Sequence, residues 1–87
     1  MMVGGQVLQN AMVTHTDDGK VYNRRQLWCV DRNGDECAVF VEDTNDARSV
    51  VPGDTCWWQG SRVYVKNDTI ILKKIGFSHD PQFNLQH

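Results

Sequence analysis

The stretch that decides the fold is Thr55–Lys66, which reads TCWWQGSRVYVK. Both halves are rich in aromatic and β-branched residues, which favour strands, and Gly60-Ser61 between them is typical of a two-residue hairpin turn. Side chains alternate between the two faces of a strand, so the adjacent Trp57 and Trp58 must point in opposite directions. Only one of the two tryptophans can therefore enter a core.

Folding this hairpin about Gly60-Ser61 sorts its side chains into two chemically different faces. A two-residue turn pairs Trp57 with Tyr64 across the strands. The face predicted to enter the core carries Cys56, Trp58, Val63 and Val65. The outer face carries Thr55, Trp57, Gln59, Arg62, Tyr64 and Lys66. Aromatic rings flanked by cations are suited to stacking on bases and contacting phosphates, but such a pair also stabilises a hairpin by about 0.2–1 kcal/mol without any ligand.

The rest of the chain reads as strands joined by turns. Further strands are predicted over Gly5–Thr16, Lys20–Asp31, Glu36–Glu42 and Thr69–Phe77. The turn signals are Asp18-Gly19, Asn33-Gly34 and Pro52-Gly53. The polar segment Thr44–Pro52 is expected to form a cap or one short helical turn. This pattern predicts an all-β fold, a small closed or partly open barrel of five or six strands, because closure removes exposed edges.

The hairpin around Asn33-Gly34 has two apolar faces. One face carries Trp28, Val30, Cys37, Val39 and Val41, and the other carries Leu27, Cys29, Ala38 and Phe40. We assign the first, longer set to the core, which leaves Phe40 outside with Arg25 beside it. If the parity is reversed, Trp28 takes the outer position instead.

The order of these elements resembles the oligonucleotide/oligosaccharide-binding (OB) fold. In single-stranded DNA-binding proteins of that fold, a Gly-Asp turn opens the fourth strand and a glycine follows; here the matching residues are Pro52-Gly53-Asp54 and Gly60. The resemblance covers nearly the whole chain and implies that the second and third strands meet the ligand. It has one departure, because two strand-like segments follow Gly60 where one is usual. A Src-homology-type barrel, which also uses adjacent tryptophans, is the rival interpretation.

Composition limits the classes of function. The 87 residues suffice for one domain, which we place at residues 1–78, followed by a polar tail at 79–87. The net charge of −2 argues against a strongly electrostatic nucleic-acid binder but allows a local basic stripe. The three cysteines have no metal-site spacing, and no secretion signal or membrane span is visible, so we expect reduced thiols in a cytoplasmic protein.

The predicted function is the non-enzymatic binding of single-stranded DNA or RNA. No catalytic arrangement, metal site or cofactor motif is recognisable. The residues expected around the binding surface are Arg24, Arg25, Phe40, Trp57, Arg62, Tyr64 and Lys66. The alternative is a protein-interaction or inhibitory module that uses the same aromatic face, since Trp, Tyr and Arg are common at protein interfaces. Self-association through that face is a third interpretation, and the oligomeric state is left open.

Overall fold

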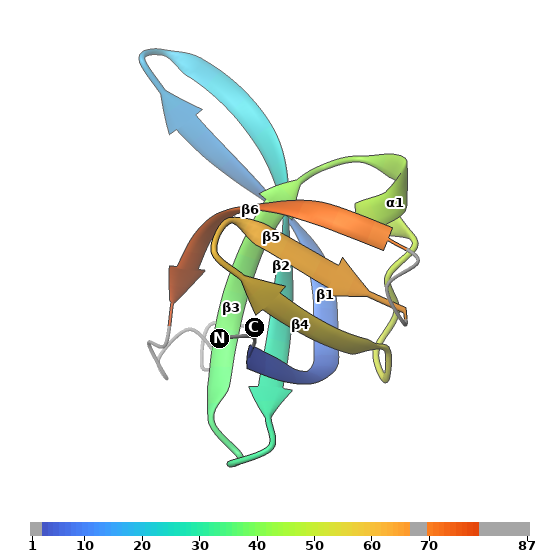
Figure 1. Ribbon diagram of the computed structural model, residues 1–87. Coiled ribbons are helices and arrows are strands. Elements are labelled where there is room, and N and C mark those ends of the chain that lie inside the picture. Colours follow the sequence, from blue (N-terminus) through green and yellow to red (C-terminus); the bar gives the residue numbers. More distant parts are fainter. Residues whose placement is uncertain (1–2, 67–69, 79–87) are drawn as a thin grey trace.

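Six strands and one short helix form a closed barrel over residues 3–66 and 70–78, which are the residues that the computed structural model describes. Neighbours in the ring β1-β2-β3-β6-β5-β4 are antiparallel throughout, and β4 returns to β1. The all-β barrel is therefore confirmed, while the expected tail at 79–87 lies outside the described residues. The elements are β1 (Val3–Asp17), β2 (Lys20–Asp31), β3 (Glu36–Glu42), α1 (Asn45–Arg48), β4 (Thr55–Gln59), β5 (Arg62–Val65) and β6 (Ile70–Ser78), shown in Figure 1.

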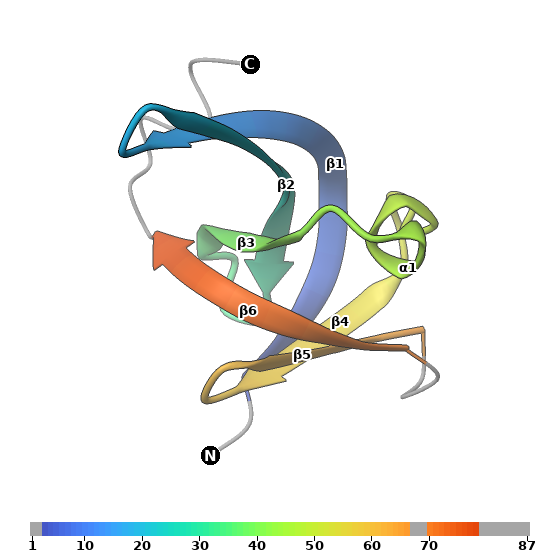
Figure 2. The same ribbon diagram turned by 90° about the horizontal axis from the view of Figure 1, so that it is seen from above.

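The last strand, β6, is the segment that the OB resemblance did not require. It lies between β3 and β5 in the ring, as the view from above shows (Figure 2). An even number of strands allows every neighbour in a closed ring to run antiparallel, whereas a ring of five would need one parallel pair. The extra strand therefore lets the barrel close with antiparallel pairing alone.

The first strand serves two purposes because it is interrupted by a bulge. Its register with β2 shifts between Val7 and Gln9, which leaves Leu8 without a partner on β2. Before the bulge β1 pairs with both β4 and β2, and after it β1 pairs with β2 alone. The end of β1 and the start of β2 consequently project from the barrel as a hairpin (Figure 1). Asp18 and Gly19 at its tip have φ values of 49° and 76°, as a primed turn requires.

The β4–β5 hairpin has the register predicted from Gly60-Ser61. Trp57 pairs with Tyr64 and Trp58 pairs with Val63. Trp58 is 5% exposed and belongs to the core, where its ring lies 5.7 Å from that of Phe77. The other three residues assigned to the core face, Cys56, Val63 and Val65, are also buried. The tryptophan doublet is therefore divided as expected, with Trp58 inside the barrel and Trp57 on its outer face.

The β2–β3 hairpin corrects one prediction. Val30 pairs with Glu36, not with Cys37, because three residues separate the hydrogen-bonded Asp31 and Asp35, and Gly34 among them adopts a φ of 84°. A slip of one residue inverts the faces of β2. Assigning Trp28 and Val30 to the same face as Cys37, Val39 and Val41 was therefore wrong, and the reversed parity holds for β2, with Leu27 and Cys29 in the core cluster. Trp28 is nonetheless buried, as predicted. The assignment for β3 was right, since Cys37, Val39 and Val41 are core residues.

The wider loop and the outward Trp28 each have a local physical cause. The Asp31 carboxylate accepts the backbone N–H groups of Asn33 and Asp35, both at 2.9 Å, and this bonding favours the three-residue loop. Although Trp28 faces outward it is only 2% exposed, and its indole N–H donates to the Glu36 carboxylate at 2.6 Å. A buried tryptophan needs such a partner for its polar edge.

The connector between β3 and β4 contains the expected single helical turn, α1. Thr44 caps it by accepting the N–H of Ala47 at 3.2 Å. Ala47 and Val50 join the core, and the Asn10 side-chain amide donates to the carbonyls of both, each at 2.8 Å. No helix within the described ranges is long and apolar enough to cross a membrane.

The turn at Pro52-Gly53 places the start of β4 beside β1. Gly53 has a φ of 96°, and the N–H of Asp54 donates to the carbonyl of Val51 at 3.1 Å, as in a type II turn. Two further backbone bonds, from Gly53 to Val7 and from Val7 to Asp54, anchor this turn on β1 at 2.8 and 2.9 Å. The position of Trp57 relative to β1 follows from this anchor.

Candidate nucleic-acid interface

A row of outward-facing residues crosses four neighbouring strands of the barrel. Register pairs Gly4 of β1 with Trp57, Trp57 with Tyr64, and Tyr64 with Ile71 of β6. We call these four residues the aromatic row. The rings of Trp57 and Tyr64 are stacked, with centroids 6.2 Å apart and planes inclined by 16°. Ile71 is 55% exposed, whereas Trp57 and Tyr64 are half-buried, so the row presents part of its apolar surface to solvent.

Two cations lie next to the aromatic row on its hairpin side. Arg62 of β5 pairs in register with Lys73 of β6, so both side chains project from the same outer face. Both residues are exposed, and neither forms an ion pair with any residue in the described ranges. Positive charge beside aromatic rings on an outer face is the combination that single-stranded nucleic acids bind. Lys73 was not among the predicted site residues, because its place next to Arg62 depends on the pairing of β5 with β6.

Lys66, which directly follows β5, makes structural contacts. Its Nζ donates to the carbonyl of Ser49 at 2.6 Å and lies 4.0 Å from the carboxylate of Asp54. Its backbone, at a φ of 58°, also donates to the Thr55 carbonyl at 3.1 Å. These bonds connect β5 to the segment that precedes β4, and the nearby carboxylate compensates part of the charge.

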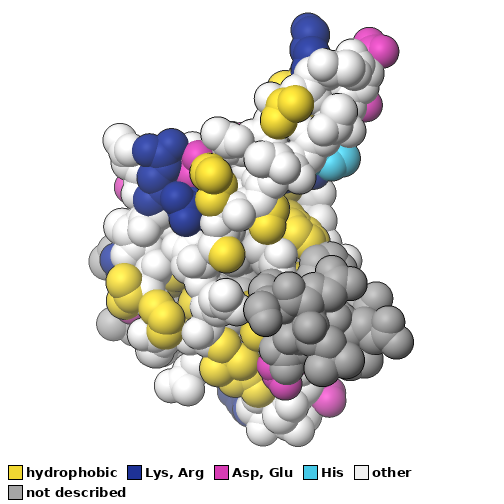
Figure 3. Space-filling model, turned by 180° about the vertical axis from the view of Figure 1, so that it is seen from behind, with side chains coloured by type: hydrophobic (Ala, Val, Ile, Leu, Met, Phe, Trp, Pro, Cys, Tyr) yellow, Lys and Arg dark blue, Asp and Glu magenta, His cyan; other side chains and the backbone are white. Residues whose placement is uncertain are grey.

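Arg25 is likewise engaged in a structural contact. Its Nε lies 3.1 Å from Asp43, whose carboxylate also accepts two hydrogen bonds from Arg48 at 2.9 and 3.0 Å. The Asp43 side chain is 6% exposed. Arg48, and to a lesser degree Arg25, lower the pKa of this carboxyl to about 2. Figure 3, which views the back of the molecule, shows a cluster of basic side chains with acidic ones against it.

The predicted site residues do not all meet on one surface. Trp57, Tyr64 and Arg62 lie together, and Lys66 lies at the end of the same strand. Arg24 pairs with Glu42, and Phe40 packs over Gly76, where an added Cβ would lie 3.2 Å from the Phe40 ring. These residues belong to β2 and β3, and β3 lies opposite β4 in the ring. Arg24, Arg25 and Phe40 therefore form no continuous surface with the aromatic row.

A groove adjoins the aromatic row at the start of β1, and sequence reasoning did not predict it. It has a volume of about 520 Å³. We call it the glycine groove, and its lining comes from β1, β4 and the end of β2 with the loop after it: Gly4, Gly5, Gln6, Val30, Asp31, Arg32, Thr55, Cys56 and Trp57. The only signal in the sequence is the Gly4-Gly5 pair within a strand, since glycine there often marks a close approach of another backbone or a ligand.

The three cysteines lie in the core as free thiols. The Sγ atoms of Cys29 and Cys56 are 3.4 Å apart. The hydrogen bond with Cys56, together with burial, raises the pKa of the Cys29 thiol far above its ordinary value. Burial raises the pKa of Cys37 to about 12. These two thiols are neutral at physiological pH, and the described residues hold no group of three or more side chains suited to a metal ion.

No family model matches the chain, and no curated protein or solved structure matches it. The function proposed below therefore rests on the aromatic row, the cations beside it and the glycine groove.

Proposed function

We propose that this protein binds single-stranded nucleic acid, without catalysing a reaction, through the outer face of β4, β5 and β6. The observation that carries the proposal is the stacked Trp57–Tyr64 pair on the outer face, beside Arg62 and Lys73, which form no ion pair within the described part of the chain. Bases stack on exposed aromatic rings with about 1–3 kcal/mol each, largely independent of sequence. The reducing cytoplasm is the expected compartment, because there the three thiols stay free.

The OB resemblance stays part of the proposal, with a change in where the ligand lies. Three meandering strands, a helical connector and a β4 that pairs back onto β1 are compatible with that fold. The resemblance implies a ligand over the second and third strands, whereas the half-buried aromatic pair on the outer face belongs to β4 and β5. We therefore place the bound strand along β4–β6, across the aromatic row.

The charge distribution predicts modest affinity with a shallow salt dependence. The chain carries a net charge of −2, so long-range attraction to a polyanion is weak. Arg62 and Lys73 together contact about two phosphates. Because each phosphate contact on a single strand contributes about −0.7, these two contacts are expected to contribute about −1.4 to the slope of log K against log salt.

A fluorescence titration with a labelled oligonucleotide at low salt tests the proposal. Trp57→Ala should weaken binding by about 5- to 150-fold, the equivalent of one stacked base. Trp57→Phe, which keeps a ring at this position, should retain most of the affinity. Tyr22→Ala removes an aromatic that is 46% exposed on the projecting hairpin and serves as the matched control with unchanged affinity. Equal binding by Trp57→Ala and the unmodified protein would refute the proposed surface.

A protein-binding role is the second candidate, and Ile71 favours it. This side chain extends the aromatic row with an apolar surface that nucleic acid does not need, whereas Trp, Tyr and Arg beside it are typical of interface hot spots. An Ile71→Ser variant separates the candidates. Loss of a nuclease-resistant protein complex, with oligonucleotide affinity unchanged, would assign the row to a protein partner.

A further inference from the structure

The indole of Trp57 has one covered side and one open side. Along the aromatic row its neighbour on β5 is Tyr64, which stacks against it, and its neighbour on β1 is Gly4, which has no side chain. A Cβ at position 4 would lie 3.4 Å from the Trp57 Cβ and 3.5 Å from the carbonyl oxygen of Cys56. Among the described residues, no side chain fills the space beside Trp57 at this register position, because residue 4 is a glycine.

Gly5, which lines the glycine groove, has no room for a side chain. A Cβ at Gly5 would lie 2.1 Å from the carbonyl oxygen of Val30, closer than any side chain tolerates. The β1 and β2 backbones approach each other at this point, where Gly5 pairs with Asp31. No side chain can therefore project from β1 at position 5, and the groove is bounded there by main chain.

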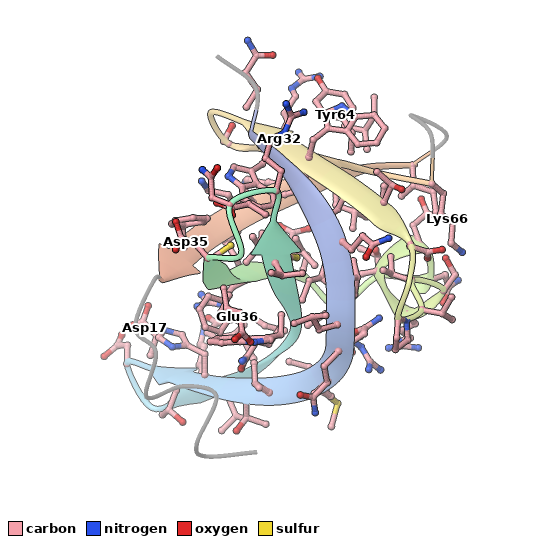
Figure 4. The ribbon with its side chains drawn as sticks, turned by 90° about the horizontal axis from the view of Figure 1, so that it is seen from below. Asp17, Arg32, Asp35, Glu36, Tyr64 and Lys66 are labelled. Carbon is pink, nitrogen blue, oxygen red and sulfur yellow. The ribbon has the colours of Figure 1, made fainter. Side chains whose placement is uncertain are left out.

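An exposed cation, Arg32, lies at the rim of the groove. Arg32 follows β2, and Figure 4 shows its side chain extending toward the side of the barrel that carries Tyr64. It is exposed and makes no hydrogen bond or ion pair within residues 3–66 and 70–78. The two bonds that Asp31 accepts from Asn33 and Asp35 hold the loop that carries it. Asp31 also lines the groove, so an anion is accepted only at the outer rim.

The groove therefore combines four features of a nucleotide site. It is lined by the aromatic Trp57, by main chain at Gly5, by the exposed cation Arg32, and by the polar side chains of Gln6 and Thr55. Its volume of about 520 Å³ lies within the range of sites for small ligands. A base in this space would continue the stack formed by Tyr64 and Trp57, and the phosphate attached to it would reach the guanidinium of Arg32.

We infer that the glycine groove binds one unpaired nucleotide of the bound strand, with its base against Trp57 and its phosphate at Arg32. This inference rests on the proposed function and adds a discrete subsite to it. The remaining nucleotides lie across the aromatic row, and removing a base from one of them should change the affinity less. The nucleotide in the groove makes contacts on several sides. The strand consequently binds in a defined position along the barrel.

The test uses an eight-nucleotide single strand in which one abasic residue is moved stepwise along the sequence. With the unmodified protein, one abasic position should lower the affinity about 5- to 150-fold, the loss expected for one stacked base. Gly4→Leu, which fills the open side of Trp57, should lower affinity for the intact strand by a similar factor. It should also abolish the sensitivity to that one abasic position.

Two variants separate the groove from effects on folding. Gly4→Ala adds one methyl group at ordinary contact distance and should keep the abasic pattern of the unmodified protein. Arg32→Gln changes an exposed loop residue and should reduce the salt slope by about 0.7, the share of one phosphate. An unchanged abasic pattern in Gly4→Leu, or an unchanged salt slope in Arg32→Gln, overturns the inference.

The same measurements distinguish an error in the groove assignment from an error in the proposed function. If Trp57→Ala weakens binding but Gly4→Leu does not, the strand lies across the row and leaves the groove empty, so only this inference falls. If the unmodified protein binds no single strand at low salt, both the subsite and the proposed function are wrong.

Discussion

The two adjacent tryptophans should differ sharply in what their removal does to stability. Trp58 is 5% exposed in the core and contacts the ring of Phe77, so Trp58→Ala leaves a large cavity and should cost about 3–5 kcal/mol. Trp57 is half-buried on the outer face, and Trp57→Ala loses mainly its stack with Tyr64, about 0.5–1.5 kcal/mol. A domain of 87 residues has a total stability of about 4–13 kcal/mol, so only the first loss threatens the fold.

Urea unfolding followed by far-ultraviolet circular dichroism measures both losses without relying on tryptophan emission. With an m-value near 2 kcal/mol per molar urea, Trp58→Ala should lower the midpoint by about 1.5–2.5 M and Trp57→Ala by less than about 0.8 M. Trp58→Phe, which keeps an aromatic ring in the core, is the control and should fall between them. Equal losses in the two alanine variants, or a larger loss for Trp57, would show that the assignment of faces is wrong.

Three further predictions concern the backbone and the titratable groups. Gly5→Ala should lower the thermal midpoint strongly, because its Cβ would lie 2.1 Å from the Val30 carbonyl oxygen, whereas Gly4→Ala should change it little; similar midpoints would contradict the close approach of β1 and β2. The buried thiols should react with a thiol reagent at pH 8 only after unfolding. The contribution of Cys37 to stability should be complete below its ordinary pKa of 9.0 and disappear as the pH rises toward about 12. The contribution of Asp43 should be complete above its ordinary pKa of 3.8 and disappear as the pH falls toward about 2; Asp43→Asn should flatten this part of an acid titration, and an unchanged titration would argue against the Arg48 contact.

The local parts of the fold were readable from the sequence because short turns connect the strands. Gly60-Ser61 determines the register of β4 and β5, and the register separates Trp57 from Trp58. The same reasoning was wrong for β2 because the carboxylate of Asp31 stabilises a loop one residue longer than the Asn33-Gly34 signal suggests. One residue is enough to exchange the two faces of a strand.

The candidate site depends on contacts between segments that are distant in the chain. The pairing of β6 with β5 places Lys73 beside Arg62, and the ring order separates Phe40 from Trp57 by half the barrel. The glycine groove needs β1, β4 and the loop after β2 to meet, and no short stretch of sequence contains that information. By itself the sequence determined the strands, most of the turns and which residue of the Trp57-Trp58 pair faces outward, because alternation and turn length are local properties. Only the tertiary structure decided what lies beside that tryptophan, because closing the barrel brings β1 against β4.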